Sequence, residues 1–248
     1  MAKLRVHNIE SGPVSSDVAF GISGDTIAVS SDSIKLNTWK DSGGNTLFVS
    51  DGTGTLSSVN SGLSGAGPKF IQTQTAAASS VVSFTSNIDS TYNEYLFVFY
   101  DIICTAGEPE FQFNVSTDGG SSYAVNKTST YYDAMHRHDG VSGTLQYVAA
   151  KDLSSSASYQ PLIQKMLHTG HYASAATSGT LRIYNVSSTT YVKNFYAHTH
   201  GVTDDADNKE SRQAVVGGVC ETTTAINTVS FNLSSGTFSG TIKMYGVS

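Results

Sequence analysis

Charged residues, proline and cysteine are all scarce in this sequence of 248 residues. Asp, Glu, Lys and Arg together make up 14% of it, and there are only 4 prolines and 2 cysteines. Few charged helix formers and no long stretch of 3.6-residue periodicity argue against a helical protein. The cysteines, Cys104 and Cys220, are too few for a disulfide scaffold. We expect buried free thiols, with a single bridge between them as the alternative.

Several functional classes lack their usual sequence signals. The 14 Lys and Arg residues are spread thinly through a chain of net charge −6, so nothing supports nucleic-acid binding. No apolar run approaches the ~20 residues of a membrane-spanning helix, and the opening MAKLRVHNIESG lacks the apolar core of a secretory leader. The sequence has no Gly-x-Ser-x-Gly elbow, phosphate loop, His-Glu-x-x-His or dinucleotide fingerprint. We therefore expect no enzyme, no catalytic residues, no cofactor and no membrane insertion.

Strand and turn formers are abundant instead. The chain has 23 Gly and many Ser and Thr, which suit short strands joined by tight turns, and 11 Phe and 13 Tyr, which suffice for a core. Alternation of apolar and polar residues marks the strands, as in EFQFNV, where Phe111 and Phe113 face inward and Gln112 and Asn114 outward. Strands are expected within residues 81–86, 92–104, 110–123, 189–198 and 226–235.

One strand pattern occurs three times in the sequence. SGTLRIYNVS at 178–187 and SGTIKMYGVS at 239–248 share nearly every residue class, and SGTLQY at 142–147 is a partial copy. In the first copy Leu181 and Ile183 point to one face and Arg182 and Tyr184 to the other, which is the pattern of a half-buried strand. About eight strands spaced in this way predict an all-β fold, an antiparallel β-sandwich that is jelly-roll-like, with the last strand paired inside a sheet.

The first 68 residues differ from the rest. They hold the only Trp, Trp39, and repeat a short strand pattern, GDTIAVS from Gly24 and GNTLFVS from Gly44. Residues 1–68 contain too few large apolar residues to enclose a core. We therefore expect pairing with other chains or with a partner to stabilise them. We assign residues 1–68 to an extended, β-rich N-terminal attachment and oligomerisation segment and residues 69–248 to the sandwich domain.

Six of the seven histidines come in close pairs. A His-x-His pair on a strand presents both imidazoles on one face, and such a pair can chelate zinc or iron, for instance around the axis of a trimer. We favour the simpler interpretation, polar residues at strand ends, because no acidic or cysteine ligand accompanies the pairs. The metal candidates are therefore secondary: His198 and His200, with His136 and His138.

Three other segments carry local signals. Asp118-Gly119-Gly120 predicts a hairpin turn. TDDADNKE at 203–210 lacks the turn Gly and final Glu of a calcium loop, so we expect a solvated loop. SYQPLIQKMLHTGHY at 158–172 is compatible with a short helix or with another strand.

The stretches VSFTSNIDSTYNEYLFVFYDI, FQFNVSTDGGSSY and INTVSFNLSSGTFSGTIKMYGV resemble small virion proteins of marine tailed bacteriophages, usually described as tail-fibre-like or structural. The opening of the chain is similar to the attachment segments that precede such domains. The resemblance implies a jelly-roll-like domain, oligomers that are often trimers, and no catalysis. It brings no agreed binding residues.

These observations favour a non-enzymatic, tail-fibre-like virion component made in the host cytoplasm. Residues 1–68 would dock on tail or capsid proteins, the chain would form a homotrimer, and the β domain would recognise a host-surface glycan or protein through Tyr-rich loops. The alternatives are a capsid decoration or head-fibre protein, a carbohydrate-binding module acting alone, and a glycan depolymerase whose scattered carboxylates pair in space.

Overall fold

The computed structural model describes residues 38–40, 43–50, 53, 56–57, 59, 67–105, 107–170, 172, 174–205 and 208–248. The chain divides into two units, residues 1–65 and 66–248. The described residues form antiparallel strands and one three-residue 3-10 helix, η1 (Ala149–Lys151), so the expected all-β class is confirmed. Among them, no helix has the length and apolar character needed to cross a membrane.

The first unit contains a small antiparallel sheet. Its strands are β1 (Thr38–Lys40), β2 (Thr46–Ser50) and β3 (Leu56–Ser57), in that order. Trp39 stacks on Phe48 of the neighbouring strand, with 5.5 Å between ring centroids. The GNTLFVS copy therefore forms a paired strand, whereas GDTIAVS lies outside the described residues. The domain boundary at residues 68/69 stays a prediction.

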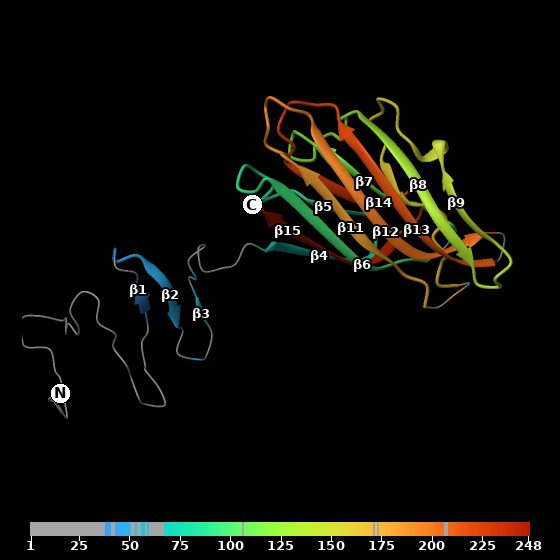
Figure 1. Cartoon of the computed structure of the whole chain (residues 1–248), viewed down its shortest axis with the longest axis horizontal. Helices are drawn as coiled ribbons and strands as arrows, with labels where there is room; N and C mark the ends of the chain where they lie inside the picture. Colours follow the sequence, from blue (N-terminus) through green and yellow to red (C-terminus); the bar gives the residue numbers. More distant parts are fainter. Residues whose placement is uncertain are drawn as a thin grey trace, which may run out of the picture. The chain divides into compact units, whose positions relative to one another are not determined.

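The second unit is built from two antiparallel sheets (Figure 1). Eight strands form the large sheet, in the order β4 (Lys69–Ser79), β15 (Phe238–Val247), β6 (Glu94–Cys104), β11 (Thr177–Tyr184), β12 (Lys193–Asp205), β13 (Asn208–Cys220), β8 (Lys127–Arg137) and β9 (Gly143–Tyr147). Four strands form the small sheet, in the order β10 (Gln160–Ile163), β7 (Phe111–Ser116), β14 (Thr228–Leu233) and β5 (Val81–Phe84).

Successive strands alternate between the two sheets, except that the hairpins β8–β9 and β12–β13 each stay within the large sheet and β11 leads into β12 inside it. With these hairpins set aside, the large sheet reads β4-β15-β6-β11 and the small sheet β5-β14-β7-β10. Such alternation is what two interleaved Greek keys require, and the jelly-roll assignment remains an interpretation that this order supports. The hairpins widen the large sheet on one side only.

Phenylalanine side chains from both sheets fill the space between them. Phe231 of β14 stacks on Phe111 at 5.7 Å and also contacts Phe97 of the large sheet, at 5.6 Å between centroids. Phe113 meets Phe195 edge to face at 5.0 Å. All four Phe residues of β6, β7 and β14 named here are fully buried. Cys104 and Cys220 are buried free thiols in the structure, as expected.

The three copies of the Ser-Gly-Thr pattern are strands of the same sheet. The copies at 178–187 and 239–248 form β11 and β15, which pair with opposite edges of the apolar strand β6. The central strand β6 therefore has on each side a strand with the same alternation of inward and outward residues. The inward residues Leu181 of β11 and Ile242 of β15 are fully buried. The expected pairing of the final strand inside a sheet is confirmed, because β15 lies between β4 and β6. The third copy forms the edge strand β9.

Four local expectations need correction or completion. The turn at Asp118-Gly119-Gly120 is not a hairpin, because β7 belongs to the small sheet and β8 to the large one, so the chain crosses between layers there. Asn114, expected to face outward, is buried, and its side-chain amide donates to the carbonyl of Ala157 at 2.9 Å. Most of segment 203–210 is strand and both of its ends are buried. Segment 158–172 contains a strand, β10, and no helix among its described residues.

Candidate binding face

The widened part of the large sheet has one side turned away from the small sheet. Along β8 and over residues 193–201 of β12 buried and more exposed residues alternate, so one set of side chains on each strand faces outward. On β13 the strand register identifies the outward set. We call the outward set the tyrosine–histidine face. It comprises Asn194, Tyr196, His198, His200 and Val202 of β12, Ser211, Gln213, Val215, Gly217 and Val219 of β13, Thr128, Thr130, Tyr132, Ala134 and His136 of β8, and Leu145 and Tyr147 of β9.

Strand register places these side chains in rows across the sheet. Tyr147 lies opposite Tyr132, Tyr132 opposite Val215, and Val215 opposite His198. Neighbouring strands are about 4.8 Å apart, so this row is roughly 14 Å long. Tyr132 is 45% exposed and Tyr147 64%. Val215, which lies between Tyr132 and His198, is only 8% exposed. The next row along the strands contains Tyr196, which is 44% exposed.

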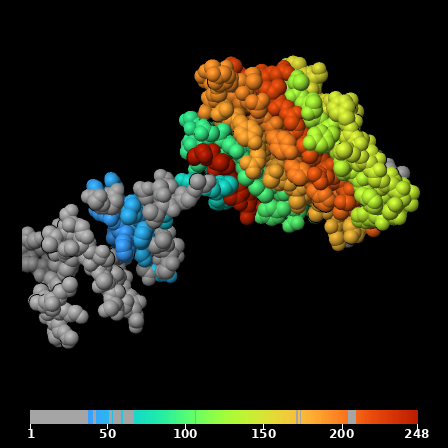
Figure 2. Space-filling view, viewed as in Figure 1, coloured from blue at the N-terminus to red at the C-terminus, as the bar shows by residue number. Residues whose placement is uncertain are grey.

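Charged side chains are missing from the tyrosine–histidine face: none of its residues is Asp, Glu, Lys or Arg. The charges at its borders already have partners. Glu221 accepts hydrogen bonds from Thr128 and Ser155, and the ammonium of Lys209 lies 4.1 Å from the ring centre of Tyr172. Arg182 on β11 is paired with Glu94. In Figure 2 the orange of β11 and β12, the red-orange of β13 and the lime of β8 lie side by side on the visible surface.

A shallow hollow adjoins this face where β12 meets β11. It has a volume of about 280 Å³ and is lined by Ser178, Gly179, Thr180, His198, Thr199 and His200. Thr180 lies opposite His198 and Ser178 opposite His200, so small side chains of β11 stand beside the larger imidazoles. His200 is also fixed by a 3.0 Å hydrogen bond between its Nε2 and the hydroxyl of Ser211.

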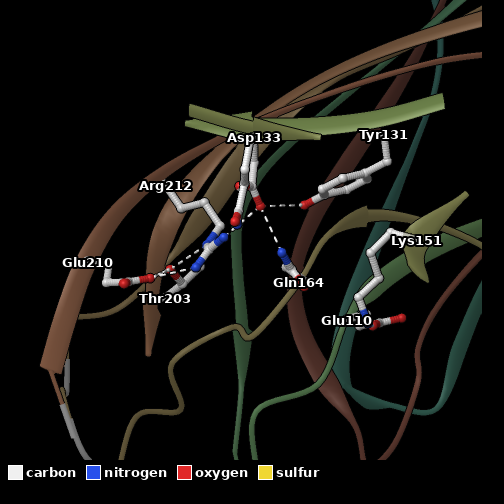
Figure 3. A network of polar contacts seen from close by, with 9 residues as sticks. Glu110, Tyr131, Asp133, Lys151, Gln164, Thr203, Glu210 and Arg212 are labelled. Carbon is white, nitrogen blue, oxygen red and sulfur yellow. Dashed lines mark hydrogen bonds and ion pairs between the residues drawn. The ribbon is translucent and has the colours of Figure 1, made fainter. Parts of the chain in front are cut away.

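A buried polar network lies on the opposite side of the same strands (Figure 3). Arg212 donates to Asp133 Oδ2 and to Glu210 Oε2, both at 2.6 Å, and to the hydroxyl of Thr203 at 3.1 Å. The Arg212 side chain is 3% exposed and the two carboxylates are fully buried. Burial by itself lowers the pKa of Arg212, but hydrogen bonds and attraction to Asp133 and Glu210 outweigh it and raise the pKa above its usual value.

Asp133 also ties the edge of the sheet to the layer beneath it. Its Oδ1 accepts from Gln146 of β9 at 2.9 Å, and its Oδ2 accepts from Gln164, in the segment after β10, at 2.8 Å. The buried hydroxyl of Tyr131 lies 3.5 Å from the same oxygen, and burial raises the pKa of this phenol. Asp133 is flanked in sequence by Tyr132 of the outer face, so the network holds that face in position from below.

The predicted metal candidates fall in or beside the same region. His198, His200 and His136 belong to the tyrosine–histidine face and His138 lies in the turn after β8, with β13 separating the two His-x-His pairs. Among the residues that the structure describes, no three His, Cys, Asp or Glu side chains gather closely enough to hold a metal ion. A site shared by three chains around an axis stays a prediction.

Sequence reasoning missed most of this face. The segment KTSTYYDAMHR at 127–137 has no alternation of apolar and polar residues that marks the outward side, because Lys127 and Asp133 are in the buried set and Tyr132 is in the exposed one. Tyr132 and Val215 are 83 positions apart in sequence and meet only through strand pairing. Tyr-rich loops are the expected place of recognition, whereas Tyr132, Tyr147 and Tyr196 of the tyrosine–histidine face lie on strands.

No protein-family model matches the chain, and neither a curated protein nor a solved structure is significantly similar to it. Its function has to be inferred from the chain itself.

Proposed function

We propose that the chain is a non-enzymatic structural component of a tailed bacteriophage virion, of tail-fibre-like type. Residues 1–68 dock on tail or capsid proteins, the chain works as a homotrimer, and the β domain is exposed for recognition of the host surface. The tyrosine–histidine face is the observation that carries this proposal. It extends over four strands, has no Asp, Glu, Lys or Arg among its residues, and is supported from below by the Asp133–Arg212 network.

Two further features support a binding role. Tyr offers apolar area together with a hydroxyl, and on a strand its backbone is held in place, so binding sacrifices little conformational freedom. The most buried carboxylates, Asp133 and Glu210, are both paired with Arg212 beneath the sheet, which favours a structural role for them over the two-carboxylate chemistry of a glycan depolymerase.

The test uses purified virions and purified full-length protein. Antibodies against residues 69–248 should label intact particles, and an excess of the protein should reduce phage adsorption to host cells. Densitometry against the major capsid protein separates the two locations: dozens of copies place the protein on the tail, and hundreds place it on the shell as a decoration or head-fibre protein. Absence from virions would overturn the proposal.

A further inference from the structure

Resting on the function proposed above, we propose that the tyrosine–histidine face binds an uncharged polysaccharide. The first argument is electrostatic. The chain carries a net charge of −6, yet no residue of the face on its four adjacent strands is Asp, Glu, Lys or Arg. The next residue of the outward set of β13, Lys209, has its ammonium over the ring of Tyr172. An acidic polymer would find no cation within the face, and a basic one no carboxylate. A neutral occupant meets no such mismatch.

The second argument is the alternation of rings and hydrogen-bonding groups. Sugar rings present C–H surfaces that pack on aromatic faces, with hydroxyls around the rim that both donate and accept. Here the exposed rings of Tyr132, Tyr147 and Tyr196 are interspersed with Gln213, Asn194 and several Thr, Ser and His side chains. The row from Tyr147 to His198, roughly 14 Å long, gives an extended chain several contact points.

The third argument concerns the hollow at the end of that row. Its volume of about 280 Å³ lies near the lower limit for small-ligand pockets. Its exposed lining is mostly apolar, as the C–H face of a sugar requires, and Ser, Thr and His side chains contribute the polar part. Because His198 belongs both to the row and to the hollow, one polymer can follow the tyrosines and place a sugar unit in the hollow.

A second copy of this chain fits the face less well. The centre of a stable protein interface is more apolar than the remaining surface. Here most outward side chains carry a hydrogen-bonding group, and those without one are Ala134, Leu145, Val202, Val215 and Val219. Pairing such a face with itself would bury many polar groups in need of exact partners. The polysaccharide carries its own donors and acceptors.

The experiment is affinity electrophoresis of the full-length protein in native gels that contain dextran, mannan, galactan or laminarin, each compared with its sulfated form. We expect at least one neutral polymer to retard the protein, and sulfation to weaken that retardation by about tenfold or more. In titration calorimetry with the retarding polymer, Tyr132→Ala and Tyr196→Ala should each weaken binding about tenfold. Tyr191→Ala is the matched control, because Tyr191 is 71% exposed but lies in the turn before β12, outside the face.

Three results would overturn the inference: no retardation by any neutral polymer, equal binding by wild type and Tyr132→Ala, or a preference for the sulfated forms. If light scattering shows that Tyr132→Ala disrupts an oligomer while polymer binding is unchanged, the face is a contact between copies and the inference also fails. Circular dichroism and Tm of each variant confirm that it is folded. Inhibition of phage adsorption without polymer binding would leave the virion function standing and remove only the glycan.

Discussion

Arg212 and Asp133 form an ion pair across β13 and β8, with 2.6 Å between Nη1 and Oδ2, and both side chains are almost completely removed from solvent. The same guanidinium also pairs with Glu210, at 2.6 Å between Nη2 and Oε2. The guanidinium of Arg212 is therefore the counter-charge of two buried carboxylates. Removing it would leave two carboxylates without a counter-charge, and burying unpaired charge is among the largest single destabilising effects known for proteins.

Arg212→Met should lower the free energy of unfolding by about 3–5 kcal/mol. The matched control is Arg182→Met, because Arg182 pairs with Glu94 at a site where the arginine side chain is 39% exposed. Loss of a solvent-exposed pair should change stability by less than about 1 kcal/mol. Urea denaturation at pH 7 compares the two. Equal effects would mean that the buried network contributes no more than a surface pair.

Lys127 predicts a pH-dependent stability. It is fully buried, its ammonium donates to Asn114 Oδ1 at 2.6 Å and to the Val125 carbonyl at 3.1 Å, and burial lowers its pKa from 10.5 to about 8. Between those two values the unfolded chain holds a proton that the folded chain has lost. The contribution of Lys127 to stability therefore rises with pH over that window.

The test compares wild type with Lys127→Met in urea denaturation at several pH values. From pH 7.5 to 9.5 the free energy of unfolding of wild type should increase relative to that of the variant by about 1–2 kcal/mol. Burial raises the pKa of Cys104 to about 11 and that of Cys220 to about 12, so over this range only the thiols of the unfolded chain titrate. They do so equally in both proteins, so the difference reports on the lysine. Parallel pH curves would show that its pKa is not lowered.

Both cysteines should be unreactive in the folded protein. Burial raises the pKa of Cys104 to about 11 and that of Cys220 to about 12, so almost no thiolate is present at pH 8. Ellman's reagent should label no thiol in native protein and two per chain in 6 M guanidinium chloride. Finding none after denaturation without reductant would instead demonstrate the alternative disulfide.

Two neighbouring glycines of β13 should respond differently to the same substitution. A Cβ on Gly218 would lie 2.5 Å from Cζ of Phe195 and 2.6 Å from the carbonyl oxygen of Thr128, whereas a Cβ on Gly217 meets nothing within 4 Å. Gly218→Ala should therefore destabilise the protein by about 1–3 kcal/mol or more, and Gly217→Ala by no more than about 0.5 kcal/mol. Thermal unfolding followed by circular dichroism measures both. Similar Tm values for the two variants would contradict the packing described for β13.

The N-terminal segment carries the prediction on assembly. We expect residues 1–68 to be stabilised by sister chains or by the particle, because ordering costs ~1–2 kcal/mol per residue and few large apolar side chains are present to offset it. A truncated chain lacking residues 1–68 should keep its β-type circular dichroism but lose particle binding, and light scattering should give a trimer for the full-length protein. An unfolded truncation, or a monomeric full-length chain with a protease-resistant N-terminus, would contradict this.

The sequence alone determined where most strands lie and which way their side chains point. Leu181, Ile183, Ile242 and Met244 are fully buried as their alternation predicts, because a two-residue period is a local property that each strand carries in its own sequence. The all-β class follows from the same local signals together with the scarcity of helix formers.

Only the tertiary structure decided which strands became neighbours. The turn at Gly119 and Gly120 reads locally like a hairpin, yet the chain crosses there to the other sheet. Asp133, Gln164 and Arg212 are far apart in the sequence, and the residues next to each of them do not predict its hydrogen-bond partners. Tyr132, Val215 and His198 form a row for the same reason. Strand pairing selects among many similar edges through the packing of the whole core, so a network or a binding face assembled across strands exists only once that core has formed.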